Sequence, residues 1–310
     1  MGIGARIEMN KDQGEKIIKD NSSLVVAKYC LSDLIIPSTT EASIADFLSY
    51  KKHEELIFNK WGLSKTHNQQ RQTAINFYGA PGTGKTMAAH AIAKELQQPL
   101  IMVDYASLES KYVGETSKNI TEIFRQAKEH QAIIFFDEAD AILSRRVTNM
   151  SHATDVSVNQ TRSVLLTLMN DHDGLTIFTT NFIENYDPAF MRRILAHIKF
   201  ELPDLICREK LWRKYIPDTL PNSVEIKKLA ELSENLSGSD ISNCVLKAAM
   251  SAARQNHLNL EIEHFKQAID EVIQSKKANS KSETKVEKRT VSSQYVESQI
   301  GKAAMQELQA

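Results

Sequence analysis

One octapeptide dominates the sequence: Gly79-Ala80-Pro81-Gly82-Thr83-Gly84-Lys85-Thr86. It fits the pattern G-x-x-x-x-G-K-[ST] at every fixed position. Residues 75–78, just before it, are apolar enough for a short strand, and residues 87–96 have the composition of a helix. Because the pattern is informative only between a strand and a helix, this context predicts a phosphate-binding loop.

The residue types of the loop suit a bound phosphate group. Glycines remove the Cβ atoms that would block close approach, so that successive main-chain N–H groups can point at the anion. A helix that begins at Lys85 adds the positive end of its dipole. Lys85 can reach the β- and γ-phosphates of a nucleotide, and the Thr86 hydroxyl can take one position on Mg²⁺. We therefore expect all eight residues to bind the nucleotide.

Length, charge and cysteine content exclude several classes of protein. The 310 residues suggest one large or two ordinary domains. With 38 Lys and Arg against 39 Asp and Glu, the chain lacks the basic footprint of a dedicated nucleic-acid binder. No apolar run approaches the ~20 residues of a membrane helix, and the amino terminus has no signal core, so we expect a cytoplasmic protein. Cys30, Cys207 and Cys244 indicate reduced thiols, with no zinc or disulfide pattern.

Strands and helices alternate through the middle of the sequence. Candidate strands cover residues 74–78, 100–104, 132–136, 175–179 and 198–201, and helices follow Lys85, Thr116, Asn159 and Pro188. This alternation predicts an α/β fold whose parallel sheet is sandwiched by helices, with ligands at the carboxyl ends of its strands. Residues 145–159 are polar and irregular, which favours a mobile loop.

The flanking regions differ from this core in composition. Residues 1–31 form a polar leader that becomes more apolar toward its end, and residues 41–61 predict two helices, which we interpret as a structural collar rather than a substrate-recognition element. From residue 203 the pattern is purely helical, at about 205–215, 225–234, 239–255 and 261–274. We therefore expect a large α/β domain over residues 32–202, a small helical domain over 203–274, and a charged linker with a possible terminal helix over 275–310.

Two carboxylates follow a buried strand at residues 133–136. At the carboxyl end of that strand, Asp137 would hold Mg²⁺, usually through water, and Glu138 would orient and polarise the attacking water. Burying two adjacent acids is costly unless a cation or hydrogen bonds offset it. Asn181, after the next strand, is a candidate for positioning the same water, although an Asn after a strand is ordinarily a turn former. Arg192 and Arg193 close a short helix, where cations suit the negative end of the helix dipole.

Several further motifs occur in a fixed order. They are residues 108–115, the Asp137-Glu138 pair, residues 165–169, Thr179-Thr180-Asn181, Asp187-Pro188-Ala189 and residues 236–241. Together with the phosphate loop, they make the chain resemble the AAA family ATPases, in the group that severs, disassembles or unfolds proteins. The resemblance runs from about Ser32 to Gln274 and implies a P-loop NTPase domain followed by a helical lid. It also implies a ring, commonly a homo-hexamer, with ATP and Mg²⁺ held between neighbouring subunits.

The resemblance assigns roles to further residues. Arg192 and Arg193 would be arginine fingers that reach the neighbouring subunit's site. Some members have a second arginine three residues after the first finger, where this chain has Ala196. The lid turn at Gly238 and Ser239 would abut the adenine base, with Leu34 and Ile35 on its other side. The sequence Lys111-Tyr112-Val113-Gly114 matches the pore loop, whose aromatic ring grips an extended polypeptide.

These features predict an ATP-hydrolysing ring that remodels, unfolds or disassembles protein substrates through a central pore, with an adaptor as a conceivable partner. A small-molecule kinase or a GTPase is an alternative use of the loop, but the sequence has no acceptor-substrate pocket pattern and no N-K-x-D guanine motif. A loader or helicase acting on nucleic acid is disfavoured by the near-neutral charge and the aromatic pore loop. A nucleotide-dependent switch or scaffold for a partner protein is a further alternative.

Overall fold

The computed structural model describes residues 23–67, 73–104, 115–144, 153–181 and 186–281. The chain divides into two compact units at Ile269 and Asp270. The first unit holds the sheet and most of the helices, and in the second the described residues, 270–281, continue the last helix. The strands are β1 (Ser23–Val25), β2 (Thr73–Gly79), β3 (Leu100–Asp104), β4 (Ile133–Asp137), β5 (Leu175–Thr180) and β6 (Ile194–Phe200).

Helices precede, separate and follow these strands. The α-helices are α1 (Ser38–Lys52), α2 (Lys85–Glu95), α4 (Glu115–His130), α5 (Asp140–Leu143), α6 (Ala153–Asp171), α7 (Pro188–Met191), α8 (Leu205–Tyr215), α9 (Ile226–Leu232), α10 (Gly238–Arg254) and α11 (Ile262–Lys281). Short 3₁₀ turns, η2 (Leu31–Asp33) and η4 (Leu63–Lys65), and a π-helical turn, η3 (Leu56–Lys60), complete the described chain.

The six strands form one sheet in the order β1-β3-β4-β5-β2-β6. All neighbouring pairs are parallel except β1 and β3, which run antiparallel with Ser23 opposite Met102. The predicted parallel sheet is therefore confirmed. The sequence did not predict strand β1, because three residues within an apolar stretch show no alternation of apolar and polar side chains. Strand β6 begins at Ile194, four residues before the predicted start at residue 198.

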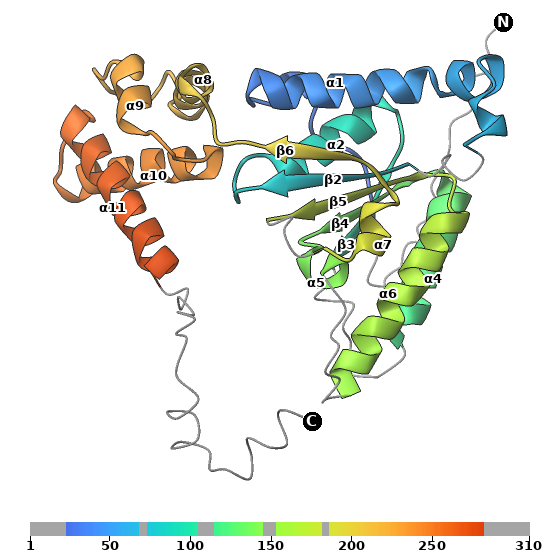
Figure 1. Cartoon of the computed structure of the whole chain (residues 1–310). Coiled ribbons are helices and arrows are strands. Elements are labelled where there is room, and N and C mark those ends of the chain that lie inside the picture. Colours follow the sequence, from blue (N-terminus) through green and yellow to red (C-terminus); the bar gives the residue numbers. More distant parts are fainter. Residues whose placement is uncertain (1–22, 68–72, 105–114, 145–152, 182–185, 282–310) are drawn as a thin grey trace, which may run out of the picture. The chain divides into compact units, whose positions relative to one another are not determined.

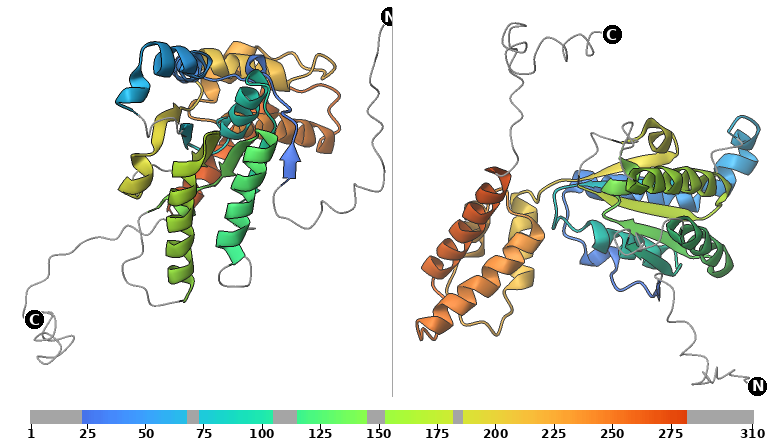
Figure 2. Two further views of the ribbon diagram at one scale, coloured as in Figure 1. Left: turned by 90° about the vertical axis from the view of Figure 1, so that its right-hand side faces the viewer. Right: turned by 90° about the horizontal axis from the view of Figure 1, so that it is seen from below.

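Helices cover both faces of the sheet, as Figure 1 shows. Side chains that alternate along β4 serve two separate cores, since successive residues of a strand point to opposite faces. Phe135 packs with α1 and α2, whereas Phe136 stacks on Phe178, with ring centroids 5.2 Å apart, in the core under α4 and α6. Helices α4 and α6 lie side by side (Figure 2). Strand β4, whose first four residues are fully buried, therefore ends at Asp137 between two packed layers.

Two predicted boundaries were wrong. Residues 153–159 are helical and form the first turns of α6, although their polar composition favoured a loop. They show no apolar periodicity of their own, and the helix is recognisable only from the buried face farther along, at Leu165 and Met169. Helix α11 ends at Lys281, whereas the sequence predicted an end at residue 274 and a linker from residue 275.

The helices after β6 have their own core. Trp212 is fully buried, stacks edge-on against Phe265 and donates a hydrogen bond of 2.9 Å from Nε1 to the Ser233 hydroxyl. The buried Arg208 donates hydrogen bonds to the carbonyl oxygens of Pro203 and Ala230. Its side chain therefore links the segment that follows β6 to helix α9. The expected α/β domain followed by a small helical lid is confirmed as a fold class.

The two helices expected over residues 41–61 correspond to α1 and η3. Ile44 and Phe47 anchor α1 in the core that also holds α2, and the Thr40 hydroxyl donates a hydrogen bond of 2.9 Å to the Lys199 carbonyl of β6. Helix α1 is thus fixed beside the last strand of the sheet. Its amino end follows directly on residues 33–37, which border the candidate site.

Candidate nucleotide-binding site

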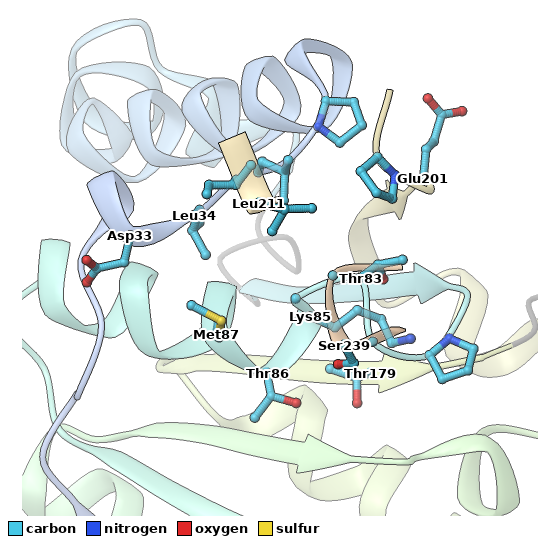
Figure 3. A pocket seen from close by; sticks show the side chains of 18 of the residues that line it. Asp33, Leu34, Thr83, Lys85, Thr86, Met87, Thr179, Glu201, Leu211 and Ser239 are labelled. Carbon is cyan, nitrogen blue, oxygen red and sulfur yellow. The ribbon is translucent and has the colours of Figure 1, made fainter. Parts of the chain in front are cut away.

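A cavity of about 360 Å³ lies at the carboxyl ends of the central strands (Figure 3). This volume is in the range of small-ligand pockets, and the place is where parallel sheets bind ligands. The walls come from residues 33–37, the loop at residues 81–87, the ends of β4 and β5, Glu201 and Pro203 after β6, and the lid helices. Its lining includes Leu34, Ile35, Pro81, Gly82, Thr83, Gly84, Lys85, Thr86, Asp137, Glu138, Thr179, Asn181, Leu211, Lys214, Tyr215, Gly238 and Ser239.

Two positions of the loop favour glycine for different structural reasons. Gly79 has a φ of 140°, and a Cβ atom there would collide with the backbone of Phe200 on the neighbouring strand β6. Gly84 has a φ of 98°, and a Cβ atom there would meet nothing within 4 Å. The space beside Gly84 is therefore open toward the start of α2, where main-chain N–H groups favour an anion. Gly79 and Ala80 lie behind the cavity and contribute carbonyl oxygens rather than its lining.

Lys85 is held by hydrogen bonds at the phosphate end of the cavity, and only 9% of its surface is exposed. Its Nζ donates to the carbonyl oxygens of Gly79 and Ala80, at 2.7 and 3.1 Å, and to Asn181 Oδ1 at 3.1 Å. Burial lowers the pKa of Lys85, and the nearby carboxylates, Asp137 first among them, partly offset this by favouring the charged form. A phosphate group in the cavity would favour that charge further.

The two predicted acids lie where β4 ends. Asp137 accepts hydrogen bonds from two hydroxyl groups, at Oδ2 from Thr86 at 3.0 Å and at Oδ1 from Thr179. Glu138 is exposed and lines the cavity, and its backbone has a φ of 51°, in the left-handed region that non-glycine residues rarely adopt. The structure thus brings Thr86, Asp137 and Glu138 together beside the phosphate loop.

Asn181 lies at the tip of β5 and is held from two sides. Its side-chain oxygen accepts from Lys85, and its backbone N–H points at both carboxylate oxygens of Asp140, at 3.2 and 3.3 Å. Sequence reasoning missed Asp140. The signal was present, because Asp140 is the third carboxylate of the run Asp137-Glu138-Ala139-Asp140.

The lid helices make two hydrogen bonds to the residues that line the cavity. The N–H of Ser239, in the first turn of α10, donates to the Gly82 carbonyl at 3.3 Å. Across the cavity, the Lys214 Nζ of α8 donates to the Asp33 carbonyl at 2.8 Å. Figure 3 shows Leu34 and Leu211 on one side of the cavity, with Lys85 and Thr86 on the opposite side.

Helix α8 contributes three lining residues that sequence reasoning missed: Leu211, Lys214 and Tyr215. Their spacing places them on one face of the helix. No short motif marks them, so only the folded lid reveals that this face borders the site.

Neither Arg192 nor Arg193 is among the described residues that line the cavity. Arg193 donates from Nε to Asn170 Oδ1 at 2.7 Å and from Nη1 to the Ala189 carbonyl at 2.8 Å, while Arg192 Nε contacts the Pro188 carbonyl at 3.3 Å. The Arg193 guanidinium group therefore folds back on α6 and α7, and that of Arg192 on α7. The predicted pore loop, Lys111, Tyr112, Val113 and Gly114, lies outside the described residues.

Comparison with known proteins gives the same assignment as the fold. Residues 75–202 match the family described as "ATPase family associated with various cellular activities (AAA)", and residues 223–267 match "AAA+ lid domain". A proteasome-activating nucleotidase of Methanosarcina mazei is 30% identical over 288 residues, covering 84% of this chain and 67% of that protein. The chain belongs to the AAA ATPase family.

Two further relatives of this AAA chain are similar over a shorter span. A proteasome-activating nucleotidase of Methanopyrus kandleri is 35% identical over 214 residues, covering 66% of this chain and 49% of the relative. The 26S proteasome regulatory subunit 8 homolog of Saccharomyces cerevisiae is 34% identical over 233 residues, covering 72% and 55%. The chain thus spans about half the length of these two relatives. Among the described helices, none combines the length and apolar character needed to cross a membrane.

Proposed function

We propose that this chain binds ATP with Mg²⁺ in the cavity and hydrolyses it, and that a ring of copies uses the hydrolysis to remodel or unfold protein substrates. One observation carries the proposal: a single cavity of about 360 Å³ collects Lys85, Thr86, Asp137, Glu138 and Asn181. A phosphate-binding cation, two oxygen ligands for a metal ion, a carboxylate base and a neutral amide are the groups that nucleotide hydrolysis requires.

The residues of the phosphate end fit ATP and Mg²⁺. The open space beside Gly84 leaves room for phosphate oxygens near the amino end of α2, and Lys85 supplies the positive charge. Thr86 and Asp137, which hydrogen-bond each other, offer the hydroxyl and carboxylate oxygens that Mg²⁺ prefers. Bound Mg²⁺ would neutralise charge that develops on the phosphate oxygens.

Glu138 and Asn181 are assigned to the attacking water. The Glu138 carboxylate would accept hydrogen bonds from that water, and the Asn181 amide would hold it without adding negative charge. Asn181 is suited to this role because Lys85 and Asp140 fix it from two sides. We assign Leu34, Ile35, Gly238 and Ser239 to the base and ribose: all four line the cavity, Leu34 lies opposite Lys85 (Figure 3), and the Ser239 N–H donates to the Gly82 carbonyl.

The ring is proposed from the position of the arginine pair. Arg192 and Arg193 do not line the cavity of their own chain, so they would act in the cavity of a neighbouring copy, as arginine fingers do. A homo-hexamer is the assembly that we propose. The names of these relatives refer to the proteasome, which supports a protein substrate, and we propose that residues 111–114 contact that substrate in a central pore. Residues 32–202, 203–274 and 275–310 remain our proposed division into the α/β domain, the lid and the linker.

The proposal is tested by Glu138→Gln, which keeps the shape of the side chain but removes the base. We expect the variant to bind Mg²⁺-ATP as the wild type does and its phosphate release to fall by about 100-fold, a typical contribution of a general base. Glu231→Gln changes an exposed glutamate of α9 and serves as the control, with unchanged turnover. Rapid phosphate release by Glu138→Gln would refute the assignment of the base.

A further inference from the structure

Thr179 lies just beyond the last register pair of β4 and β5, where a side-chain hydrogen bond connects the two strands. The regular register of the two strands ends with Phe136 opposite Phe178. At the next pair, the Thr179 hydroxyl donates to Asp137 Oδ1. A side chain therefore joins the two strands just beyond their last register pair.

The backbone after Asp137 is held by the same threonine. Glu138 has a φ of 51°, a conformation that costs energy in a residue with a Cβ atom and persists only when the surroundings enforce it. The Glu138 N–H donates to Thr179 Oγ1 at 3.1 Å as well as to Asp137 Oδ1 at 3.1 Å. The next N–H, that of Ala139, donates to the Thr179 carbonyl at 2.8 Å. Thr179 thus accepts from the N–H groups on both sides of the Glu138 side chain.

The hydroxyl of Thr179 acts as donor and acceptor at once. It donates a hydrogen bond to the Asp137 carboxylate and accepts one from the Glu138 N–H. A valine side chain has nearly the same shape but can make neither bond. Thr179 borders the cavity but has only 1% of its surface exposed, so water has little room to replace the hydroxyl. One hydroxyl oxygen is therefore hydrogen-bonded both to the Asp137 carboxylate and to the backbone of Glu138.

We propose that Thr179 is a positioning residue for ATP hydrolysis, which fixes the Asp137 carboxylate and keeps the backbone of Glu138 in the left-handed conformation that directs its side chain into the cavity. The inference rests on the proposed function, because it assigns Thr179 a part in the step that Glu138 carries out. Thr179 acts through these two acids and is not itself given a chemical role.

Two substitutions separate the hydroxyl from the shape of the side chain. Thr179→Val removes the hydroxyl, and Thr179→Ser retains it. Because Thr179→Val loses both hydrogen bonds of the hydroxyl, we expect it to lower kcat by about tenfold, with KM for ATP within about twofold of the wild type. We expect Thr179→Ser to retain most of the wild-type kcat. Thr176→Val, at a position of β5 with 3% exposure, is the matched control and should change neither constant.

Amide hydrogen exchange gives a second readout that does not require turnover. In the nucleotide-free full chain, we expect the Glu138 and Ala139 amides to exchange about tenfold faster in Thr179→Val than in the wild type or in Thr176→Val. A merely destabilised strand would instead raise exchange throughout β5 in both valine variants.

The inference is overturned if Thr179→Val keeps the wild-type kcat and exchange rates, if Thr179→Ser is impaired as strongly as Thr179→Val, or if Thr176→Val causes the same losses. Hydrolysis by the wild type together with an unaffected Thr179→Val would refute only the role of Thr179. Absence of hydrolysis in the wild type would refute the proposed function and, with it, the part of Thr179 in turnover.

Discussion

The two ends of the cavity each contain a lysine that donates to a backbone carbonyl, yet the two lysines are held very differently. Lys85, at the phosphate end, is buried and has three acceptors, including the side chain of Asn181. Lys214 lies at the end that we assign to the nucleobase, called the base end below. It is exposed and, among the described residues, donates only to the carbonyl of Asp33. The phosphate end is therefore preorganised, whereas the base end is joined by contacts that solvent weakens.

The difference follows from how each end is built. One continuous loop and the adjoining ends of β4 and β5 form the phosphate end, and the β-ladders fix these strands relative to each other. Two distant parts of the chain form the base end, residues 33–37 and helix α8, while the start of α10 contacts Gly82 of the phosphate loop. We infer that affinity depends mainly on the phosphate end, and that the lid contacts adjust it.

The largest effect should come from Lys85→Met, which removes the buried charge and all three of its hydrogen bonds. We expect the affinity for ATP to fall by about 100-fold, since a hydrogen bond to a charged group contributes up to about 3 kcal/mol. Titration of a fluorescent ATP analogue measures the change, and Lys128→Met, at an exposed position of α4, is the control. Near-normal binding by Lys85→Met would mean that the phosphate end is not the main source of affinity.

A smaller effect is expected from Lys214→Met at the base end. Because the contact is exposed, the affinity for ADP should fall by only about threefold, and the affinity for inorganic tripolyphosphate should not change. Arg213→Met, at the exposed neighbouring position of α8, should leave both affinities unchanged. The comparison fails if Lys214→Met weakens ADP as strongly as Lys85→Met does, or if it weakens tripolyphosphate to the same extent as ADP.

The same difference explains what the sequence could predict. The phosphate loop, Asp137 and Glu138 follow directly on strands, so local patterns located them, and the structure gathers them in one cavity. Leu211 and Tyr215 reach the cavity only through the folded lid, and no local pattern marks that helix face. Thr179 was visible as part of a motif, but the role that we propose for it depends on the register of β4 and β5, which cannot be read from the sequence.

Arg192 and Arg193 also differ from Lys85, because they lie outside the cavity of their own chain. Lys85, Thr86, Asp137, Glu138 and Asn181 line the cavity of one chain, whereas Arg192 and Arg193 lie outside the cavity lining and contact Pro188, Ala189 and Asn170. A complete site, in this account, contains the cavity of one copy and the arginines of the next. Each copy would then need a neighbour in order to hydrolyse ATP.

The most direct test mixes two inactive variants, Lys85→Met and the double variant Arg192→Ala/Arg193→Ala, and measures ATP hydrolysis across mixing ratios. Each variant alone should be inactive, the first for lack of bound nucleotide and the second for lack of the finger. Mixed assemblies, verified by mass, should regain activity where an intact cavity meets intact arginines, with a maximum near equal amounts. If verified mixed assemblies gain no activity at any ratio, the claim that neighbouring copies share the site is contradicted.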